Sequence, residues 1–215
     1  MKLVLASGNA KKLAELAALF SPLGVEMLSQ AALGIAEADE PHVTFVENAL
    51  AKARHAARAA GGAALADDSG LCVDALGGAP GVVSARFAQL AVGSVAPGAA
   101  VAQVADQAGR DAANNALLLE RMAGVVDRRA RFVSVLVAVR HADDPEPLVA
   151  TGRWDGLLLN APRGAGGFGY DPLLHIAALG RSVAELDAAT KNRHSHRAAA
   201  AAQMLALMRD GWLRG

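Results

Sequence analysis

The sequence predicts an α/β fold, because short apolar runs typical of buried strands alternate with segments whose apolar residues recur at helical spacing. Leu3–Ala6 is one such run. Residues 131–140 form the strongest, apolar on both faces as a central strand requires. Helical spacing appears at residues 13–20 and again near Met204–Met208. We find no internal repeat and no linker, so we expect a single domain over residues 1–215.

Composition narrows the class of protein. A chain of 215 residues that is 53% hydrophobic can bury a substantial core. Its 21 basic and 21 acidic residues balance, so no overall field attracts nucleic acid or an acidic membrane, and we expect neither as a partner. The single cysteine, Cys72, excludes an internal disulfide and a cysteine zinc cluster. No segment resembles a signal peptide or a membrane span, so a cytoplasmic location is expected.

The N-terminal segment reads as strand, turn and helix. Leu3–Ala6 is the strand, Ser7-Gly8-Asn9 the turn, and residues 13–20 carry the apolar face of the helix. Such a turn presents backbone N–H groups and a helix N-terminus, which together form an anion site. Lys11 and Lys12 lie in the first helical turn, where the helix dipole disfavours cations. Their presence favours a bound anion that compensates.

An acidic loop at residues 37–41 contains Glu37, Asp39 and Glu40 and precedes the next expected helix. Thr44 and Glu47 form a T-x-x-E capping box, which indicates a helix that continues to Ala60. Two glycines then end it.

The strongest candidate for a functional site is the stretch Ala66-Asp67-Asp68-Ser69-Gly70, which contains two adjacent acids. It lies between the apolar runs 63–65 and 71–73, so we expect a turn between two strands. Buried carboxylates are costly unless they are paired or hold a cation. A solvated turn is the alternative, since Asp, Ser and Gly are ordinary turn residues. Taken alone, the stretch favours that alternative, and the case for a site depends on the rest of the chain.

The second half of the chain continues the alternation. Residues 89–109 are rich in Ala, Gly and Val, and we interpret them as an insertion without evident chemistry. A helix is expected from Asp111, and 148–154 is expected to pair as an antiparallel strand with the strand at 131–140. A glycine-rich loop follows at 160–172. Further helix starts are indicated at Ser182, through a capping box with Glu185, and near Ser195.

Several familiar nucleotide motifs can be set aside. Gly164, Gly166 and Gly169 match G-x-G-x-x-G, but this pattern must open a helix and here it runs into Pro172. Neither a P-loop nor a nucleophile elbow is present. The loop could present Phe168 and Tyr170 to a planar base, or these aromatic residues could simply cover the core. Composition leaves the two alternatives even.

Basic residues crowd one short segment near the last expected helix. A solvated charged face is the ordinary interpretation, but so basic a helix start favours a facing anion. Together with Lys12 this segment could clamp a phosphate chain. His196 could instead donate a hydrogen bond to a base carbonyl. The segment comprises Lys191, Arg193, His194, His196 and Arg197.

Carboxylates are the best candidates for metal ligands. Asp67, Asp68 and a residue of the loop 37–40 could hold Mg²⁺, which takes one or two carboxylates with water and substrate phosphates. The six histidines show no zinc spacing. Acids, bases and glycine turns together suggest metal-assisted phosphate chemistry.

Six short motifs follow one another along almost the whole chain: Ser7–Lys12, Phe45–Ala49, Ala66–Gly70, Gly77–Gly81, Gly167–Asp171 and Ser195–Arg197. In this order the set resembles the inosine/xanthosine triphosphate pyrophosphatases, enzymes that remove non-canonical purine nucleotides.

The resemblance implies an elongated α/β domain with a long twisted mixed sheet and two lobes, flanked by helices, around a central substrate cleft. It implies a homodimer and Mg²⁺-dependent release of pyrophosphate from ITP, dITP and XTP. Asp68 would be the catalytic base and a metal ligand, with Glu40 as a second acid near the metal. The implied substrate-binding residues are Ser7, Gly8, Asn9, Ala10, Lys11, Lys12, Ser69, Phe168, Gly169, Tyr170, Asp171, Lys191, His196 and Arg197.

Two features depart from the family pattern. Ser7 stands where the family commonly has Thr, which keeps the hydroxyl, and the stretch 89–109 is longer and richer in Ala and Gly than expected. Two alternatives remain: a pyrophosphatase for modified pyrimidine nucleotides, and a non-catalytic nucleotide-binding module. The intact acid pair argues against the second.

Overall fold

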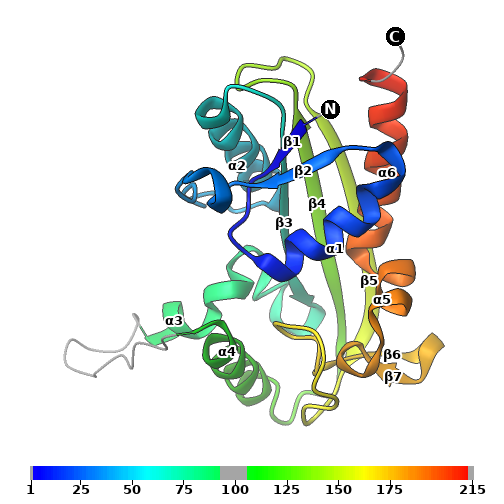
Figure 1. Ribbon diagram of the computed structural model, residues 1–215. Helices are drawn as coiled ribbons and strands as arrows, with labels where there is room; N and C mark the ends of the chain where they lie inside the picture. The colour runs from blue at the N-terminus through cyan, green and yellow to red at the C-terminus, as the bar shows by residue number, and fades with distance from the viewer. Residues whose placement is uncertain (1, 93–105, 213–215) are drawn as a thin grey trace. The chain divides into compact units, whose positions relative to one another are not determined.

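A computed structural model describes residues 2–92 and 106–212. Its strands form one seven-stranded sheet in the order β2-β1-β3-β4-β5-β6-β7. β1 runs parallel to β2 and β3, whereas β6 runs antiparallel to β5 and β7. The sheet is therefore mixed, and with its helices it confirms the predicted α/β class (Figure 1). The strands are β1 Lys2–Leu5, β2 Glu26–Ser29, β3 Ala64–Val73, β4 Arg129–Val139, β5 Leu148–Leu158, β6 Leu174–Ile176 and β7 Arg181–Ser182.

The helices begin close to the residues that the sequence indicated. Thr44 and Ser195 cap helices with their side chains, and Gly61 ends one in the left-handed region at φ 64°. The helices are α1 Ala10–Phe20, α2 Phe45–Ala60, α3 Phe87–Val92, α4 Gln107–Arg121, α5 Ala188–His194 and α6 His196–Gly211. Short 3₁₀ helices cover Ser21–Leu23, Ala31–Leu33, Asp74–Leu76, Gly81–Arg86, Ala177–Leu179 and Val183–Glu185.

Internal contacts divide the chain into two compact units. Unit 1 comprises Met1–Ser69, Val133–Arg153 and Asn192–Gly215, and unit 2 comprises Gly70–Phe132 and Trp154–Lys191. Of the Ala/Gly-rich insertion predicted at 89–109, residues 93–105 lie outside the described residues. The extent of that insertion and the single-domain organisation stay predictions.

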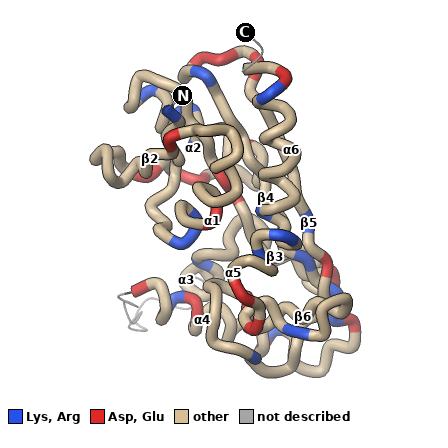
Figure 2. Tube along the Cα trace, turned by 45° about the vertical axis from the view of Figure 1, so that its right-hand side comes forward, with Lys and Arg blue, Asp and Glu red and all other residues tan. Residues whose placement is uncertain are grey.

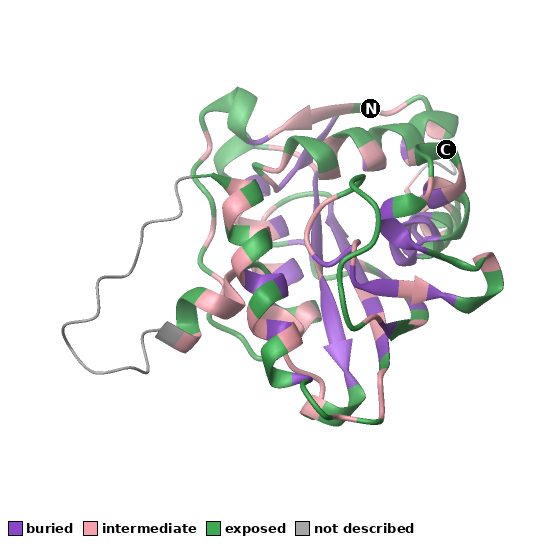
Figure 3. Ribbon diagram, turned by 90° about the horizontal axis from the view of Figure 1, so that it is seen from below, coloured by how far each residue is buried: buried purple, intermediate pink, exposed green. Residues whose placement is uncertain are grey.

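Unit 1 has two apolar layers, one on each face of its strands. α1 and α6 pack on one face and α2 on the other (Figure 1). The alternation of a β-strand separates the two sets, since Leu65 belongs to the first layer and Ala66 to the second. β1, β3 and β4 are mostly buried, whereas β2 has no buried residue and the helices alternate between buried and exposed positions (Figure 3). On α2 the buried apolar positions are all alanine: Ala49, Ala53, Ala56 and Ala57.

The turn predicted at 66–70 is wrong. β3 runs without interruption from Ala64 to Val73 and carries both acids in its middle. Asp67 is 1% exposed and Asp68 is 5% exposed. A strand can bury these carboxylates because cationic side chains from the helices meet each of them, and so no turn is needed to expose them to water.

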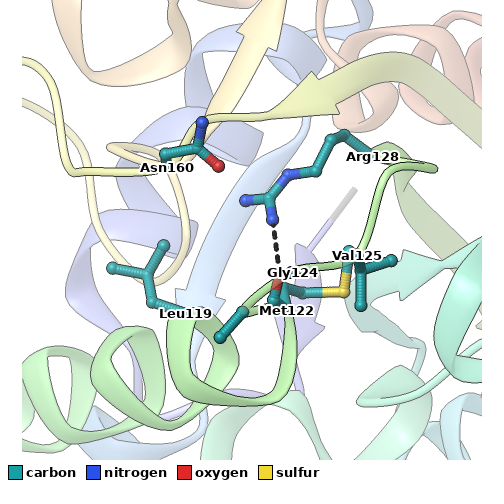
Figure 4. A pocket seen from close by; sticks show the side chains of 7 residues that line it. Leu119, Met122, Gly124, Val125, Arg128 and Asn160 are labelled. Carbon is teal, nitrogen blue, oxygen red and sulfur yellow. Dashed lines mark hydrogen bonds between the residues drawn. The ribbon is translucent and has the colours of Figure 1, made fainter.

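Unit 2 has its own core, in which the ends of β3, β4 and β5 pack with α4 and β6. Beside the end of α4 is a cavity of about 440 Å³ (Figure 4). Arg128 crosses this region and donates hydrogen bonds to the carbonyl oxygens of Met122, Leu158 and Leu159. Arg128 thereby ties the C-terminal end of α4 to the end of β5.

The distribution of charged residues and the hydropathy of the helices can be compared with the expectations from composition. Basic and acidic positions are interspersed along the trace (Figure 2). Within the described part of the chain, no helix is long and apolar enough to cross a membrane.

Candidate functional site

The start of α1 is built by Asn9. Its side chain accepts hydrogen bonds from the backbone N–H groups of Lys11 and Lys12, while its own N–H donates to Ser7 Oγ at 3.2 Å. The N-cap thus uses two of the backbone donors expected at the anion site. The Lys12 side chain turns towards β3, where its Nζ lies 3.2 Å from Asp67 Oδ2.

Asp67 is the centre of a buried network. Its Oδ2 atom lies 3.1 Å from Arg197 Nε and accepts a hydrogen bond from Ser69 Oγ, while Oδ1 accepts one from Ser134 Oγ at 2.7 Å. Burial acts to raise the pKa of Asp67, but the charges of Lys12 and Arg197 outweigh it and hold that pKa well below its ordinary value. Asp67 is therefore a fixed anion that orients two cations.

Arg197 is buried at the start of α6, with 2% of the residue exposed. Its guanidinium contacts Asp67, Ser69 Oγ and Glu15, the last from α1. Every nitrogen of this side chain thus has a partner from unit 1. The arrangement joins α1, β3 and α6 at one point.

Gly152 on β5 allows α6 to begin where it does. A Cβ atom at this position would lie 1.9 Å from the carbonyl oxygen of His196 and 2.6 Å from the backbone nitrogen of Ala200. Only glycine permits so close an approach of helix and strand. The location of His196 and Arg197 therefore depends on a residue without a side chain.

Asp68 lies on the other face of β3 and meets Lys52 of α2. Lys52 Nζ lies 2.6 Å from Asp68 Oδ1 and 2.8 Å from Glu40 Oε1. Burial raises the pKa of Asp68 above its ordinary value, and the Lys52 ammonium offsets only part of this effect. Burial also acts to lower the pKa of Lys52, but the Asp68 and Glu40 carboxylates raise it overall, so Lys52 stays charged.

Asp68 and Glu40 also fit a divalent cation. Their carboxylates already converge on one cation, the Lys52 ammonium, and Asp68 Oδ2 is a buried atom without a hydrogen-bond partner in the structure. No group of three or more His, Cys, Asp or Glu suited to a metal occurs among residues 2–92 and 106–212. Two carboxylates match Mg²⁺, which takes its remaining ligands from water and phosphates.

The loop before β6 forms a separate cluster in unit 2. Lys191 Nζ lies 2.7 Å from Asp171 Oδ2 and 4.6 Å from the centre of the Phe168 ring. Asp171 Oδ2 also accepts a hydrogen bond from the Phe168 N–H. Gly167 has φ 74°, and a Cβ atom there would lie 2.0 Å from Asp171 Oδ2, so this conformation requires glycine.

These features can be compared with known proteins. The model of the Ham1 family matches residues 3–207 of the chain. The chain belongs to the Ham1 family. A relative from Methylibium petroleiphilum named dITP/XTP pyrophosphatase is 66% identical over 213 residues, which cover 99% of this chain and 100% of the relative. A protein of the same name from Leptothrix cholodnii is 64% identical, with 99% of each chain covered.

Solved structures agree with this Ham1 assignment. A HAM1 protein from Coxiella burnetii matches with a TM-score of 0.82 and 39% identity, covering 98% of this chain and 100% of that one. The Ham1 protein of Staphylococcus aureus matches with a TM-score of 0.79 and 31% identity, covering 98% of this chain and 99% of that one. The family resemblance seen in the sequence is confirmed.

The structure gathers the predicted Ham1 site residues into two groups. The first, in unit 1, is Ser7 to Lys12, Glu40, Asp68, Ser69, His196 and Arg197. The second, in unit 2, is Phe168 to Asp171 with Lys191.

Four of the candidate residues differ in their surroundings from what the sequence suggested. Asp67, a possible metal ligand, has both oxygens engaged by unit 1 partners. Tyr170 is 4% exposed and donates a hydrogen bond to the Ser84 carbonyl, which favours the alternative that this aromatic residue covers the core. Arg193 and His194 are exposed, whereas His196 and Arg197 are buried.

Sequence reasoning missed three members of these networks. Lys52 is four residues after the buried Asn48 and four before the buried Ala56, so a lysine on the buried stripe of α2 was the available signal. Ser134 was likewise visible as a polar residue within the apolar strand β4. No local pattern distinguishes Glu15, which is selected only by its contact with Arg197.

Proposed function

We propose that the protein hydrolyses non-canonical purine nucleoside triphosphates, namely ITP, dITP and XTP, to the monophosphate and pyrophosphate. The observation that carries this proposal is the buried carboxylate of Asp68, whose Oδ2 atom has no hydrogen-bond partner while Oδ1 is held by Lys52. Such a group is oriented and keeps one oxygen available to accept a proton. The names of the curated relatives support the same reaction.

Asp68 serves as the general base. Burial raises the pKa of Asp68, which makes its carboxylate a stronger base than that of an exposed aspartate. A water molecule attacks the α-phosphorus and gives a proton to Asp68. The bond between the α-phosphorus and the oxygen that bridges it to the β-phosphate breaks, and pyrophosphate leaves with that oxygen. Lys12 and the backbone of the turn Ser7–Ala10 bind the triphosphate and stabilise the charge on its oxygens.

Mg²⁺ is the proposed cofactor, with Asp68 and Glu40 as its protein ligands. When bound, it supplies neutralisation of charge on the phosphoryl oxygens. Lys52 holds both carboxylates in place and reduces their mutual repulsion.

The nucleoside is assigned to the second group, Phe168 to Asp171 with Lys191, and His196 of unit 1 stays a proposed substrate contact. Selectivity follows from hydrogen-bond donors directed at the 6-keto oxygen. A 6-amino group would leave those donors unpaired, so ATP is the poorer substrate. Ser69 and Arg197 complete the proposed contacts.

The test is a pyrophosphate-release assay with Mg²⁺ on ITP, dITP, XTP, GTP and ATP, with orthophosphate followed in parallel. Pyrophosphate from the 6-keto non-canonical purines and little from ATP is the expected result. Orthophosphate instead would move the cut to the terminal phosphate and overturn the mechanism. Nucleotide binding without either product would leave a non-catalytic module.

The assembly and location belong to the same proposal. We infer a cytoplasmic homodimer that takes a small nucleotide substrate and neither nucleic acid nor membrane. Light scattering coupled to gel filtration tests the dimer, and a monomeric mass at micromolar concentration would refute it.

A further inference from the structure

Two side chains of α4 hold one residue of the loop before β6. Asp111 Oδ2 accepts a hydrogen bond of 2.7 Å from the N–H of Gly169, and Asn115 Nδ2 donates one of 2.9 Å to the carbonyl oxygen of Gly169. Residues four apart lie on the same face of a helix, one turn above the other. α4 therefore contacts both the donor and the acceptor of a single loop residue. We call Asp111 and Asn115 the α4 clamp.

The α4 clamp is itself firmly mounted. Asn114, next to Asn115, accepts a hydrogen bond from the Ala88 N–H and donates one to the Ala85 carbonyl. Arg128 fixes the other end of the helix through Met122 (Figure 4). Both halves of the clamp thus belong to a helix that is anchored elsewhere in unit 2.

Asn115 can face the loop in only one orientation. The Gly169 carbonyl oxygen accepts but cannot donate, so the amide nitrogen of Asn115 must point at it. Asn115 is 9% exposed, and its Oδ1 atom is buried without a hydrogen-bond partner in the structure. A buried amide left half satisfied is unfavourable by itself, and the bond to Gly169 is the only side-chain hydrogen bond of Asn115 within the described residues.

The loop needs such a constraint. Gly164, Gly167 and Gly169 all have positive φ, at 81°, 74° and 61°. Glycine has more conformational freedom than any other residue, so without outside contacts this segment would sample many backbone states. Ordering it on ligand binding would then reduce affinity.

We propose that Asp111 and Asn115 are positioning residues that fix the loop Phe168–Asp171 in its nucleoside-binding conformation. This inference rests on the proposed function, because it assigns the loop to the nucleoside. The clamp residues touch Gly169 and not the reacting atoms. Their effect is therefore on nucleoside affinity rather than on the chemical step.

The first test uses the free protein and needs no activity. Hydrogen–deuterium exchange is measured on peptides that cover residues 164–173, in the wild type and in Asp111→Ala and Asn115→Ala. Faster exchange confined to this loop is expected in both variants. The matched control is Glu120→Ala, which removes an exposed carboxylate from the same helix and leaves both hydrogen bonds to Gly169 in place. Exchange in the loop that is unchanged in the clamp variants, or raised equally in the control, would overturn the proposal.

The second test is kinetic. Both clamp variants should raise KM for ITP about tenfold, the equivalent of roughly one hydrogen bond, with kcat within about twofold of the wild type. Inorganic tripolyphosphate has no nucleoside, so its inhibition constant should not change. Asp111→Asn keeps an acceptor for the Gly169 N–H and should restore the wild-type KM. A fall in kcat at constant KM would contradict the clamp. Inactivity of the wild type would refute the proposed function alone, since the exchange experiment would still decide the clamp.

Discussion

Asp67 and Asp68 are consecutive residues of β3 that face opposite sides of the sheet. Asp67 contacts Lys12 of α1 and Arg197 of α6, whereas Asp68 contacts Lys52 of α2. Both oxygens of the first carboxylate accept hydrogen bonds from protein groups, whereas one oxygen of the second has no hydrogen-bond partner in the structure. We infer that Asp67 supports the site and Asp68 carries out its chemistry.

Asp68→Asn should abolish turnover without unfolding the protein. The amide keeps the size of the side chain and can still accept a hydrogen bond from Lys52, but it cannot accept a proton from water. Loss of a general base lowers kcat by about 10²–10⁴-fold. Single-turnover pyrophosphate release measures the effect, and a urea unfolding midpoint close to that of the wild type serves as the control. Near-normal turnover would refute the assignment of Asp68 as the base.

Asp67→Asn should act mainly on stability. Removing one partner of a buried ion pair leaves the charges of Lys12 and Arg197 poorly compensated, which costs about 3 kcal/mol. Chemical denaturation at neutral pH measures the change. Equal stability of Asp67→Asn and Asp68→Asn would contradict the division of roles between the two acids.

Lys12→Ala should weaken substrate binding more than the chemical step. Removing the ammonium deletes a phosphate contact present in both the ground state and the transition state, so KM for ITP should rise while kcat changes little. Lys2→Ala, which removes the same charge from the exposed start of β1, is the control. An unchanged KM in Lys12→Ala would count against the proposed triphosphate site.

Gly152→Ala should displace the start of α6. The added methyl group would meet the His196 carbonyl, so helix and strand must separate, and we expect a loss of roughly 2 kcal/mol together with reduced activity. Gly62→Ala is the matched control because nothing lies within 4 Å of a Cβ atom there. If both variants proved equally stable, the contact between Gly152 and α6 would be less tight than the structure gives it.

Asp144→Asn should change how stability depends on pH. The side chain of Asp144 is fully buried, and hydrogen bonds from the Arg140 guanidinium hold its pKa below the ordinary value although burial opposes this. A depressed folded-state pKa stabilises the protein above the unfolded-state value of about 3.9, and this contribution is lost as pH falls through the folded-state pKa. The stability difference between wild type and variant should therefore be largest near neutral pH and shrink below about pH 4.

Denaturation over a pH series tests this expectation. Asp143→Asn is the control, because Asp143 is 89% exposed and its pair with Arg58 at 3.6 Å is a surface contact of little weight. A difference between wild type and Asp144→Asn that is constant with pH would show that the Asp144 carboxylate does not carry the effect.

Much of the fold could be predicted because its signals are local. The caps Thr44 and Ser195 and the apolar strand β4 are each visible within a few residues of sequence. The turn predicted at 66–70 failed for the opposite reason. Asp67 and Asp68 are stable inside a strand only because Lys12, Lys52 and Arg197 reach them from distant segments, and no local propensity records such partners.

The same limit applies to the candidate site. Its residue types indicated phosphate chemistry from the sequence. The pairing of Arg197 with Glu15 could not be predicted in the same way, because it joins residues far apart in the chain. The contact of Gly152 with α6 could not be predicted from composition either. Nothing in the sequence distinguishes this glycine from the other glycines among the 22, and only the packing of α6 against it shows its role.

The alanine face of α2 has a consequence for the chemistry of β3. Small side chains at Ala49, Ala53 and Ala56 let the helix axis come close to the sheet, and this spacing sets how far the flexible stem of Lys52 must extend to meet Asp68. A larger residue at any of these alanines would push the helix outwards and lengthen the distance between ammonium and carboxylate, although it would touch neither. The thickness of the alanine layer between α2 and the sheet thus influences the basicity of the Asp68 carboxylate on β3.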